Sequence, residues 1–593
     1  MTEESGGKAG ERKGMAVYLC GCRDLISRKI DLESIAKELE GDERVVSVGI
    51  HEALCSKEGQ EFLKKEYASK GFERATVAAC SPNIQGLIVS RSLEEEGMNK
   101  YLFEQVNIRE QCAWVHSDKD AATGKARSLV KGAVARTEML EPLEDIDVHI
   151  DPSTLVIGGG VAGMQAALDI ASQGFKVHLV ERSGELGGRA YKLSMTFPTH
   201  NCGICCMQYC KECVFTPKIE DVIQNKNIDV LLGSEVEDIT GGFGKRHVTV
   251  RTPDGPKEFD VGTVIVATGS KTFDPRRIPE LRYGNPDVIT TQELEQLMVD
   301  QREKGGGLRR RSDGKVPKTV NFIQCVGSRD KVKGNLHCSL VCCTYAIGQA
   351  REIRKLDPEA TIYIHYIDLR GPYRGFEEFY NAAKEEGIQF VRGRVAEIVE
   401  DRGKIFVRAV DTDSETLLNI DSDLVVLAVG QEPADGNEKI VKMLHLQTDL
   451  DRFIKDINPM FPSEFRRGIY IAGAAQGPKG IRYSIEDAKS AAAGAIDLMK
   501  KGTIRFPRIV AYVDETRCRG CGRCEETCEY GAVTVTQDPK TGTLTSKVDE
   551  IRCEGCGACA VACCNKTITV NNFKREQVEA QLRAILEEAM SDG

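Results

Sequence analysis

One stretch, Ser153-Thr-Leu-Val-Ile-Gly158-Gly159-Gly160-Val-Ala-Gly163-Met-Gln-Ala-Ala167, determines the main fold of this chain. It reads as an apolar strand, a glycine turn and the beginning of a helix, where free N–H groups and the helix dipole bind a pyrophosphate. A second predicted strand, residues 176–180, ends at Glu181. This residue lies 21 positions beyond Gly160, where a ribose-binding acid is expected. The stretch therefore predicts a dinucleotide-binding α/β domain.

Three later segments identify the dinucleotide as FAD. They are Glu185-Leu-Gly-Gly-Arg189, the strand end Val264-Ile-Val-Ala-Thr-Gly269, and Gly468-Ile-Tyr-Ile-Ala-Gly473 before an alanine-rich helix near residues 484–493. This set is typical of flavoproteins with two dinucleotide-binding domains. A nicotinamide-binding Rossmann domain, the simpler alternative, leaves the last segment unexplained. The predicted FAD-binding residues are Gly158, Gly160, Val161, Ala162, Gly163, Glu181, Arg182, Gly188, Arg189, Ala267, Thr268, Gly269, Gly473 and Ala474.

Where such flavoproteins have a second fingerprint, this sequence has cysteines. The segment Lys318-Thr-Val-Asn-Phe-Ile-Gln-Cys325-Val-Gly-Ser begins as a strand but lacks G-x-G-x-x-G, and Cys338, Cys342 and Cys343 follow it. Without that glycine cradle for a pyrophosphate, direct oxidation of NAD(P)H is not expected. The four cysteines suit an iron–sulfur cluster held between the end of a strand and the start of a helix.

The C-terminal region contains a doubled cysteine run, Cys518-x-x-Cys521-x-x-Cys524-x-x-x-Cys528 and Cys553-x-x-Cys556-x-x-Cys559-x-x-x-Cys563. This is the bacterial ferredoxin pattern, in which the fourth thiolate of each run binds the other run's cluster. We therefore assign Cys518, Cys521, Cys524 and Cys563 to one [4Fe–4S] cluster and Cys553, Cys556, Cys559 and Cys528 to a second. A zinc ribbon or a disulfide framework is the alternative, but zinc sites use paired C-x-x-C knuckles, not two runs of four.

Two further groups of cysteines are candidate cluster ligands. The first follows apolar, strand-like runs in a predicted parallel α/β domain and comprises Cys20, Cys22, Cys55, Cys80 and Cys112. Five thiolates can hold one [4Fe–4S] cluster, but free cysteines are also often simply buried, and the spacing leaves both readings open. The second group lies between the FAD segments and comprises Cys202, Cys205, Cys206, Cys210 and Cys213. For it we favour an iron–sulfur cluster over a zinc knuckle.

The composition is that of a globular protein with several domains, since 593 residues exceed what a single core holds. A formal charge of −10 without a basic block argues against binding nucleic acid. No apolar run reaches the roughly 20 residues of a membrane helix, so no transmembrane segment is expected. The polar N-terminus predicts no secretory signal and hence a cytoplasmic protein in a reducing compartment. No paired catalytic side chains are evident, so the predicted chemistry belongs to cofactors.

Taken together, these residues resemble the A subunit of heterodisulfide reductase, a flavin and iron–sulfur family. The resemblance covers nearly the whole chain and rests on Cys20-Gly-Cys22, Ala78-Ala-Cys80-Ser-Pro, Asn107-Ile-Arg-Glu-Gln-Cys112-Ala-Trp-Val-His, Thr196-Phe-Pro-Thr, Cys342-Cys-Thr-Tyr-Ala-Ile and Ala475-Gln-Gly-Pro. It implies FAD, one cluster on the N-terminal domain, one on the cysteines at 325, 338, 342 and 343, and two in the C-terminal region. Four or five [4Fe–4S] clusters are therefore expected.

The resemblance also implies a multidomain α/β architecture. Residues 1–146 form an N-terminal α/β cluster domain. A thioredoxin reductase-like core with two dinucleotide-binding domains follows, with FAD-binding parts at 147–315 and 411–505 around a second Rossmann-like domain at 316–410. An α+β bacterial-type ferredoxin domain at 506–572 and a helix at 573–593 complete the chain.

An electron-transfer subunit of an anaerobic multi-subunit oxidoreductase is the implied function. Its expected partners are subunits similar to heterodisulfide reductase B and C, hydrogenase- or dehydrogenase-linked subunits, the class II benzoyl-CoA reductase complex, which has a similar subunit, or ferredoxin. Three positions depart from the family pattern. A short cysteine-rich segment replaces the ferredoxin insertion of methanogen members, Ala474 stands where a Cys is frequent, and Gly348 stands where many bifurcating members have a Lys near the flavin. Electron bifurcation, a non-bifurcating electron wire and an NAD(P)H–ferredoxin-type reductase therefore remain as alternatives.

Overall fold

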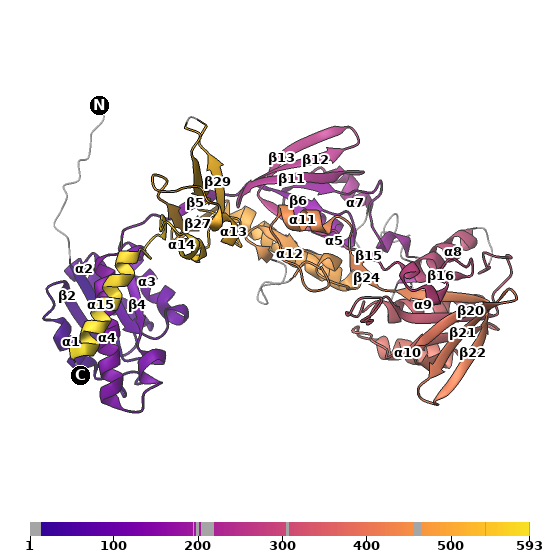
Figure 1. The fold of residues 1–593 in the computed structure, drawn as a ribbon, viewed down its shortest axis with the longest axis horizontal. Coiled ribbons are helices and arrows are strands. Elements are labelled where there is room, and N and C mark those ends of the chain that lie inside the picture. The colour runs from indigo at the N-terminus through magenta and orange to yellow at the C-terminus, as the bar shows by residue number, and fades with distance from the viewer. Residues whose placement is uncertain are drawn as a thin grey trace. The chain divides into compact units, whose positions relative to one another are not determined.

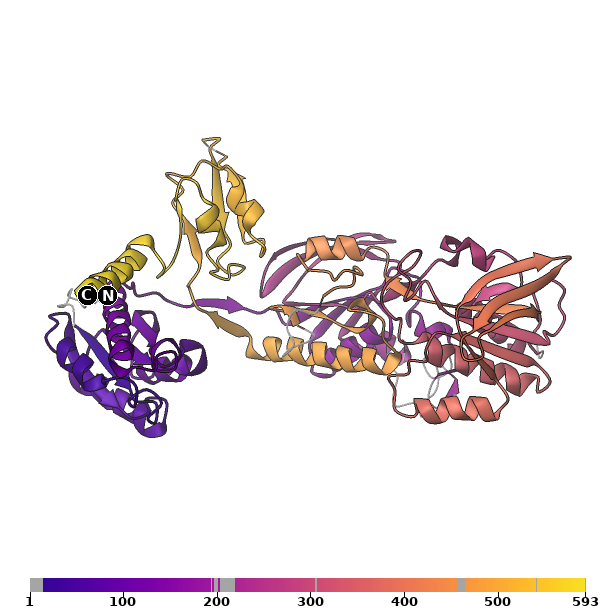
Figure 2. The same cartoon turned by 60° about the horizontal axis from the view of Figure 1, so that its bottom comes forward.

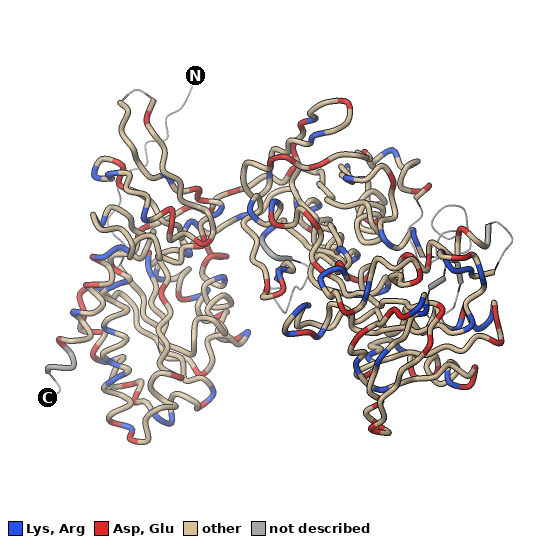
Figure 3. The backbone as a smooth tube through the Cα atoms, turned by 45° about the vertical axis from the view of Figure 1, so that its right-hand side comes forward, with Lys and Arg blue, Asp and Glu red and all other residues tan. Residues whose placement is uncertain are grey.

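A computed structural model describes residues 14–193, 195–196, 201–202, 219–303, 307–455, 464–539 and 541–591 (Figure 1). The chain divides into two compact units, of which unit 1 comprises Met1–Ile146 and Arg505–Gly593 and unit 2 comprises Asp147–Ile504. Within the described residues, no helix has the length and apolar character needed to cross a membrane. Acidic and basic residues are interspersed along the chain in both units (Figure 3).

Unit 2 contains a six-stranded sheet that includes the glycine-turn strand. The strand order is β10 (Ile228–Leu231), β7 (Lys176–Val180), β6 (Ser153–Ile157), β14 (Thr263–Val266), β26 (Ile469–Ile471) and β25 (Glu464–Arg466), parallel except for β25. Strands β6 and β14 are buried at every position, which explains why they read as continuous apolar runs. Helices α5 (Val161–Ser172) and α12 (Ile481–Lys501) pack together on this sheet, and Figure 2 shows α12 as the long orange helix.

A second parallel sheet of unit 2 has the order β16 (Val288–Thr290), β23 (Leu424–Val429), β17 (Thr319–Val326), β18 (Thr361–Tyr366) and β19 (Gln389–Arg392). Its helices are α8 (Thr291–Glu303), α9 (Cys342–Leu356) and α10 (Phe376–Glu385). Strands β16 and β23 belong to this sheet although they lie outside the predicted range 316–410. Strand β23 pairs with both β16 and β17 and contributes to the buried core of the sheet.

Smaller elements complete unit 2. The antiparallel sheets are β11 (Glu235–Gly242), β12 (Lys245–Thr252) and β13 (Gly255–Val261), then β20 (Val395–Asp401), β21 (Lys404–Asp411) and β22 (Thr416–Ser422), and the pair β8 (Met195–Thr196) and β9 (Asn201–Cys202). Helix α7 (Ile219–Gln224) lies between β9 and β10 in sequence, and α11 (Asn437–Met443) follows β22. Strands β15 (Ser270–Thr272) and β24 (Gln431–Pro433) pair antiparallel where the chain passes between the two large sheets and returns.

The N-terminal part of unit 1 is a parallel sheet in the order β2 (Val45–His51), β1 (Met15–Cys20), β3 (Arg74–Ala79) and β4 (Phe103–Asn107). Its helices are α1 (Leu32–Leu39), α2 (Lys57–Lys70), α3 (Leu87–Glu94) and α4 (Lys119–Glu138). Three of them begin at side-chain caps, since Asp31, Ser56 and Asp118 accept hydrogen bonds from the backbone N–H groups three residues on. Alternating strands and helices thus form the small α/β domain that the sequence predicts.

Strands β5 (Ile146–His149) and β27 (Thr503–Phe506) lie at the two points in the sequence where the chain passes from one unit to the other. The C-terminal part of unit 1 comes after the second of these points. It contains the strand pairs β28 (Ala511–Val513) with β31 (Ile568–Val570) and β29 (Val533–Gln537) with β30 (Leu544–Val548). Two short helices, α13 (Arg523–Thr527) and α14 (Ala558–Ala562), lie between the strands in sequence. These two antiparallel strand pairs and the larger sheets of both units confirm the predicted multidomain α/β fold class.

The last helix, α15 (Arg575–Ser591), packs along α4 of the N-terminal domain (Figures 1 and 2). The approach is close, because a Cβ added at Gly132 would lie 2.6 Å from Ile585 Cγ1. Just before α15, the buried Asn572 side chain donates to Tyr101 O and Glu141 O, each at 3.1 Å, and accepts from Glu141 N–H at 2.8 Å. The two ends of the chain therefore share one folded unit.

Candidate functional site

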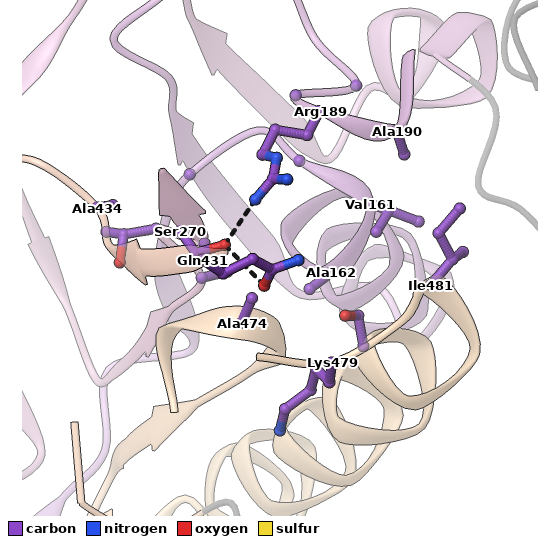
Figure 4. A pocket seen from close by; sticks show the side chains of 18 of the residues that line it. Val161, Ala162, Arg189, Ala190, Ser270, Gln431, Ala434, Ala474, Lys479 and Ile481 are labelled. Atoms are coloured by element: carbon purple, nitrogen blue, oxygen red, sulfur yellow. Dashed lines mark hydrogen bonds between the residues drawn. The ribbon is translucent and has the colours of Figure 1, made fainter. Parts of the chain in front are cut away.

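A cavity of about 810 Å³ lies in unit 2 (Figure 4). Its walls come from the glycine turn after β6, the ends of β7 and β14, the β15–β24 pair, helices α8 and α9, and the start of α12. Ligands of open α/β sheets bind outside the carboxyl ends of the strands, and this cavity occupies that place on the six-stranded sheet. Its volume is within the range of small-molecule and cofactor sites.

The glycine turn fits a pyrophosphate. Gly158 has a φ of 110°, and an added Cβ would lie 2.3 Å from Ala267 O, so only glycine fits the turn. At Gly163 an added Cβ would lie 1.8 Å from Gly158 O, which allows helix α5 to approach its strand. At Gly160, which precedes α5, an added Cβ would meet no atom within 4 Å. The backbone at the start of α5 is therefore open to a ligand in the cavity.

Glu181 lines the cavity and also accepts hydrogen bonds from backbone N–H groups near the glycine turn. Its Oε2 accepts a hydrogen bond from Gly159 N–H at 2.6 Å, and its Oε1 accepts from Ser183 N–H at 2.8 Å. The acid predicted to bind a ribose hydroxyl thus also fixes the conformation of the glycine turn.

Most of the residues predicted to bind FAD line the cavity. Those that line it are Gly158, Gly160, Val161, Ala162, Glu181, Arg182, Gly188, Arg189, Ala267, Thr268, Gly269 and Ala474. Gly163 and Gly473 lie behind the wall, where added Cβ atoms would meet Gly158 O and Ala162 Cβ. Sequence reasoning missed Ser270, Gln431 and the segment 479–481. The Gly480 that caps α12 was a usable signal, because it places a second helix N-terminus at the cavity.

Arg189 is labelled in the upper part of Figure 4, and its guanidinium is directed toward Ser270. Its Nη1 donates to Ser270 Oγ at 3.0 Å, and Ser270 Oγ donates to Gln431 Oε1 at 3.2 Å. Burial lowers the pKa of Arg189 from its usual value. Strands β15 and β24, which come from distant parts of the sequence, therefore hold a cation in the cavity wall through neutral groups.

Four cysteines gather beside this cavity, at the carboxyl end of β17 and the start of α9. Burial first, and then the neighbouring thiols of Cys343 and Cys338, raise the pKa of Cys325 to about 11. A hydrogen bond with Cys343 and burial raise the pKa of Cys342 well above its usual value, and Cys325 and Cys338 add to that shift. The four thiols are thus mutual neighbours, as the ligands of a single cluster must be.

The N-terminal domain brings together four of its five cysteines. Burial raises the pKa of Cys20 to about 11, with the thiols of Cys22 and Cys55 adding to the shift. Burial also raises the pKa of Cys80, with the same two neighbours contributing. For Cys112 burial raises the pKa to about 11, but no other cysteine takes part. This thiol is fully buried among apolar residues packed against α4.

In the ferredoxin-like region the structure brings residues of the two cysteine runs together. Burial raises the pKa of Cys518, and Cys563 of the second run adds to this, but hydrogen bonds from Gly520 and Ser546 leave that pKa lowered overall. Burial, together with Cys553, Cys528 of the first run and Cys556, raises the pKa of Cys559 to about 11. Backbone N–H groups also donate to these sulfur atoms, for example from Ala532 to Cys528 at 3.3 Å. Such donors stabilise thiolates that bind a cluster.

The structure describes only one cysteine of the group that lies between the FAD segments. Cys202 ends β9, and Cys205, Cys206, Cys210 and Cys213 lie outside the described residues. All of the cysteines that are described are free of disulfides. Among the described side chains, no group of three or more His, Cys, Asp or Glu converges closely enough to hold a single metal ion.

Two family models match parts of the chain. Residues 152–312 match the pyridine nucleotide-disulphide oxidoreductase family, and residues 517–567 match the 4Fe-4S dicluster domain. Among solved structures, thioredoxin reductase of Lactococcus lactis aligns with 59% of this chain and 100% of its own, at 18% identity and a TM-score of 0.40.

Two curated relatives align with almost the entire chain. The iron-sulfur A subunit (number 2) of CoB–CoM heterodisulfide reductase from Methanopyrus kandleri is 38% identical, covering 97% of this chain and 99% of the relative. The A subunit of the H(2):CoB-CoM heterodisulfide,ferredoxin reductase from Methanothermobacter thermautotrophicus is 34% identical, covering 91% and 93%.

The fold, the cavity and the cysteine sets thus define an oxidoreductase subunit whose cofactors are FAD and [4Fe–4S] clusters. The predicted cofactor types are confirmed. Within that class, this chain belongs to the A-subunit family of heterodisulfide reductases, as its resemblance to that family predicts.

Proposed function

We propose that this chain transfers electrons between FAD, its [4Fe–4S] clusters and partner subunits of a multi-subunit oxidoreductase. Helix α9 carries the main support. Its first residues are Cys342 and Cys343, and one and two turns further on Tyr345 and Gly348 line the cavity. A single rigid element therefore belongs to both candidate redox sites. FAD exchanges electrons singly or in pairs whereas a cluster exchanges single electrons, so this proximity suits a junction between the two.

We assign the cofactors to residues that the fold brings together. FAD is assigned to the cavity that begins at the glycine turn. Four clusters are assigned to Cys20, Cys22, Cys55 and Cys80; to Cys325, Cys338, Cys342 and Cys343; to Cys518, Cys521, Cys524 and Cys563; and to Cys553, Cys556, Cys559 and Cys528. The group from Cys202 to Cys213 is proposed to hold a fifth. Metal analysis distinguishes these assignments, because the ferredoxin-like region alone would give only about eight irons per chain.

Gly348 favours electron transfer without bifurcation over flavin-based electron bifurcation. It lies in the cavity wall on α9, where a lysine would place a cation and glycine places none. Transfer without bifurcation, of the kind expected for a class II benzoyl-CoA reductase complex, is therefore our preferred form of the function. Partners similar to heterodisulfide reductase B and C subunits, hydrogenase- or dehydrogenase-linked subunits, or ferredoxin belong to the same proposal, as does a cytoplasmic location.

Direct reaction with NAD(P)H is disfavoured by the same helix. A nicotinamide dinucleotide would place its pyrophosphate at the start of α9, but Cys342 and Cys343 occupy that first turn. The strand before it, β17, carries Cys325 next to its last residue and is not followed by the glycine-rich turn that such a ligand needs.

Two experiments test the proposal. Anaerobic purification from the native host should yield this chain together with other redox subunits, with about one FAD and 16 to 20 irons per chain for four or five clusters. Mixing the isolated chain with NADH or NADPH in an anaerobic stopped-flow instrument should leave the flavin absorbance unchanged. Rapid bleaching by either nucleotide alone would contradict the proposal and support a nucleotide-dependent reductase.

A further inference from the structure

Arg189 is a cation of the cavity lining whose described hydrogen-bond partner is a neutral group. Lys479 and Arg482 also line the cavity, but Lys479 pairs with Asp487, and Arg482 pairs with Glu486 at 3.0 Å. Arg189 has no ion pair with any residue that the structure describes, and its hydrogen bond goes to the neutral Ser270. A half-buried guanidinium without a carboxylate is costly unless a bound ligand supplies negative charge.

The guanidinium is firmly held. Gln431, which accepts from Ser270, is 5% exposed, and its own backbone is bonded on both sides. Its N–H donates to Ser339 Oγ at 2.8 Å, and its carbonyl oxygen accepts from His337 Nε2 at 2.8 Å. Ser339 and His337 flank Cys338 in sequence. A continuous hydrogen-bonded path therefore runs from Arg189 to the loop that presents this cysteine.

The direction of the side chain separates Arg189 from the predicted phosphate end of the cavity. Figure 4 shows the guanidinium turned toward Ser270 and Gln431. On the side of α9, Tyr345 and Gly348 line the same cavity as Arg189. Arg189 thus bears its charge in a cavity bounded by the helix that carries Cys342 and Cys343 in its first turn.

We propose that Arg189 is the positive group that stabilises the reduced ring of FAD, and that Ser270 and Gln431 are positioning residues that hold it there. This inference rests on the proposed FAD site. Taking up two electrons from a redox partner and one proton from water leaves the ring with one negative charge, whereas the oxidised ring is neutral. A fixed cation beside the ring therefore binds the reduced form more tightly than the oxidised form, and raises the reduction potential.

The test compares charge-removing and charge-keeping variants of the full-length protein. Arg189→Met removes the cation at similar length, Arg189→Lys keeps a positive charge, and Arg408→Met is the matched control because Arg408 lies outside the cavity lining and pairs with Glu397 at 2.8 Å. An anaerobic spectroelectrochemical titration gives the flavin midpoint potential, and fluorescence titration of apoprotein gives the affinity for oxidised FAD. We expect Arg189→Met to lose about tenfold in the preference for reduced over oxidised FAD, or about 30 mV for a two-electron couple.

The variants give distinct outcomes. Arg189→Lys should retain most of the parent potential, Arg408→Met should match the parent, and Ser270→Ala should shift it in the same direction as Arg189→Met but less. An unchanged potential in flavin-loaded Arg189→Met overturns the inference. So does equal weakening of both redox forms, which would mean that Arg189 pairs with a phosphate of FAD. Parent protein that binds no flavin would instead refute the proposed FAD site.

Discussion

The N-terminal cysteines provide the sharpest prediction, because the structure separates one of five chemically identical candidates. Cys80→Ala removes one of the four thiols that lie together, so anaerobically purified protein should lose one cluster, about four irons per chain. Cys112→Ala removes a thiol that is fully buried among apolar side chains and has no cysteine neighbour contributing to its pKa. Its iron content should equal that of the parent.

The cost of Cys112→Ala should appear in stability instead. Deleting one buried sulfur atom is comparable to deleting a buried methyl group, about 1 kcal/mol. For a unit of this size that corresponds to a loss of about 2–4 °C in Tm. Iron and sulfide analysis, EPR of the reduced protein and anaerobic thermal unfolding measure both effects. Loss of four irons in Cys112→Ala, or full iron content in Cys80→Ala, would refute the assignment.

Three other expectations follow from the same structure. Gly160→Ala should fold, because its added Cβ meets open space, but it should retain less FAD. Gly163→Ala should instead disrupt the glycine turn and lower the yield of folded protein. Equal flavin content in the parent and in Gly160→Ala would contradict this prediction. Asn572→Ala should destabilise unit 1 by about 3 kcal/mol in chemical denaturation, because three buried hydrogen bonds to backbone groups are lost at about 1 kcal/mol each. Burial lowers the pKa of His365 from 6.5 to about 4, so its neutral form stabilises unit 2 fully above pH 6.5 and progressively less as the pH falls toward 4. Between pH 7 and pH 5 the parent should therefore lose about 2 kcal/mol more than His365→Asn, and parallel losses would show that His365 is not responsible.

Local spacing explains what could be predicted from the sequence. The glycine turn and the doubled cysteine run are short motifs whose geometry depends on neighbouring residues. The crossing of Cys528 and Cys563 between the two runs follows from that spacing, and the structure places each beside the other run. The alternating strands of the N-terminal domain were likewise evident, since their apolar runs match the buried strands β1 and β3.

Contacts between distant segments explain what could not be predicted. Cys112 follows a strand of the same sheet as Cys80, so both looked equivalent, but the structure buries Cys112 completely in the apolar cluster that packs against α4. The position of the Arg189 side chain depends on hydrogen bonds through Ser270 to Gln431. The pairing of β15 with β24 brings Gln431 next to Ser270. No local pattern around either residue indicates that pairing.

The packing of α15 on α4 can form only late in translation, because the two helices lie far apart in the sequence. Because unit 1 is built from both ends of the chain, several hundred residues are translated after α4 before its partner helix leaves the ribosome. At about 5–20 residues per second, this interval is on the order of a minute. During that time the nascent chain exposes the surface around Gly132 that Ile585 later covers. Unit 1 is therefore completed only after unit 2 has been translated.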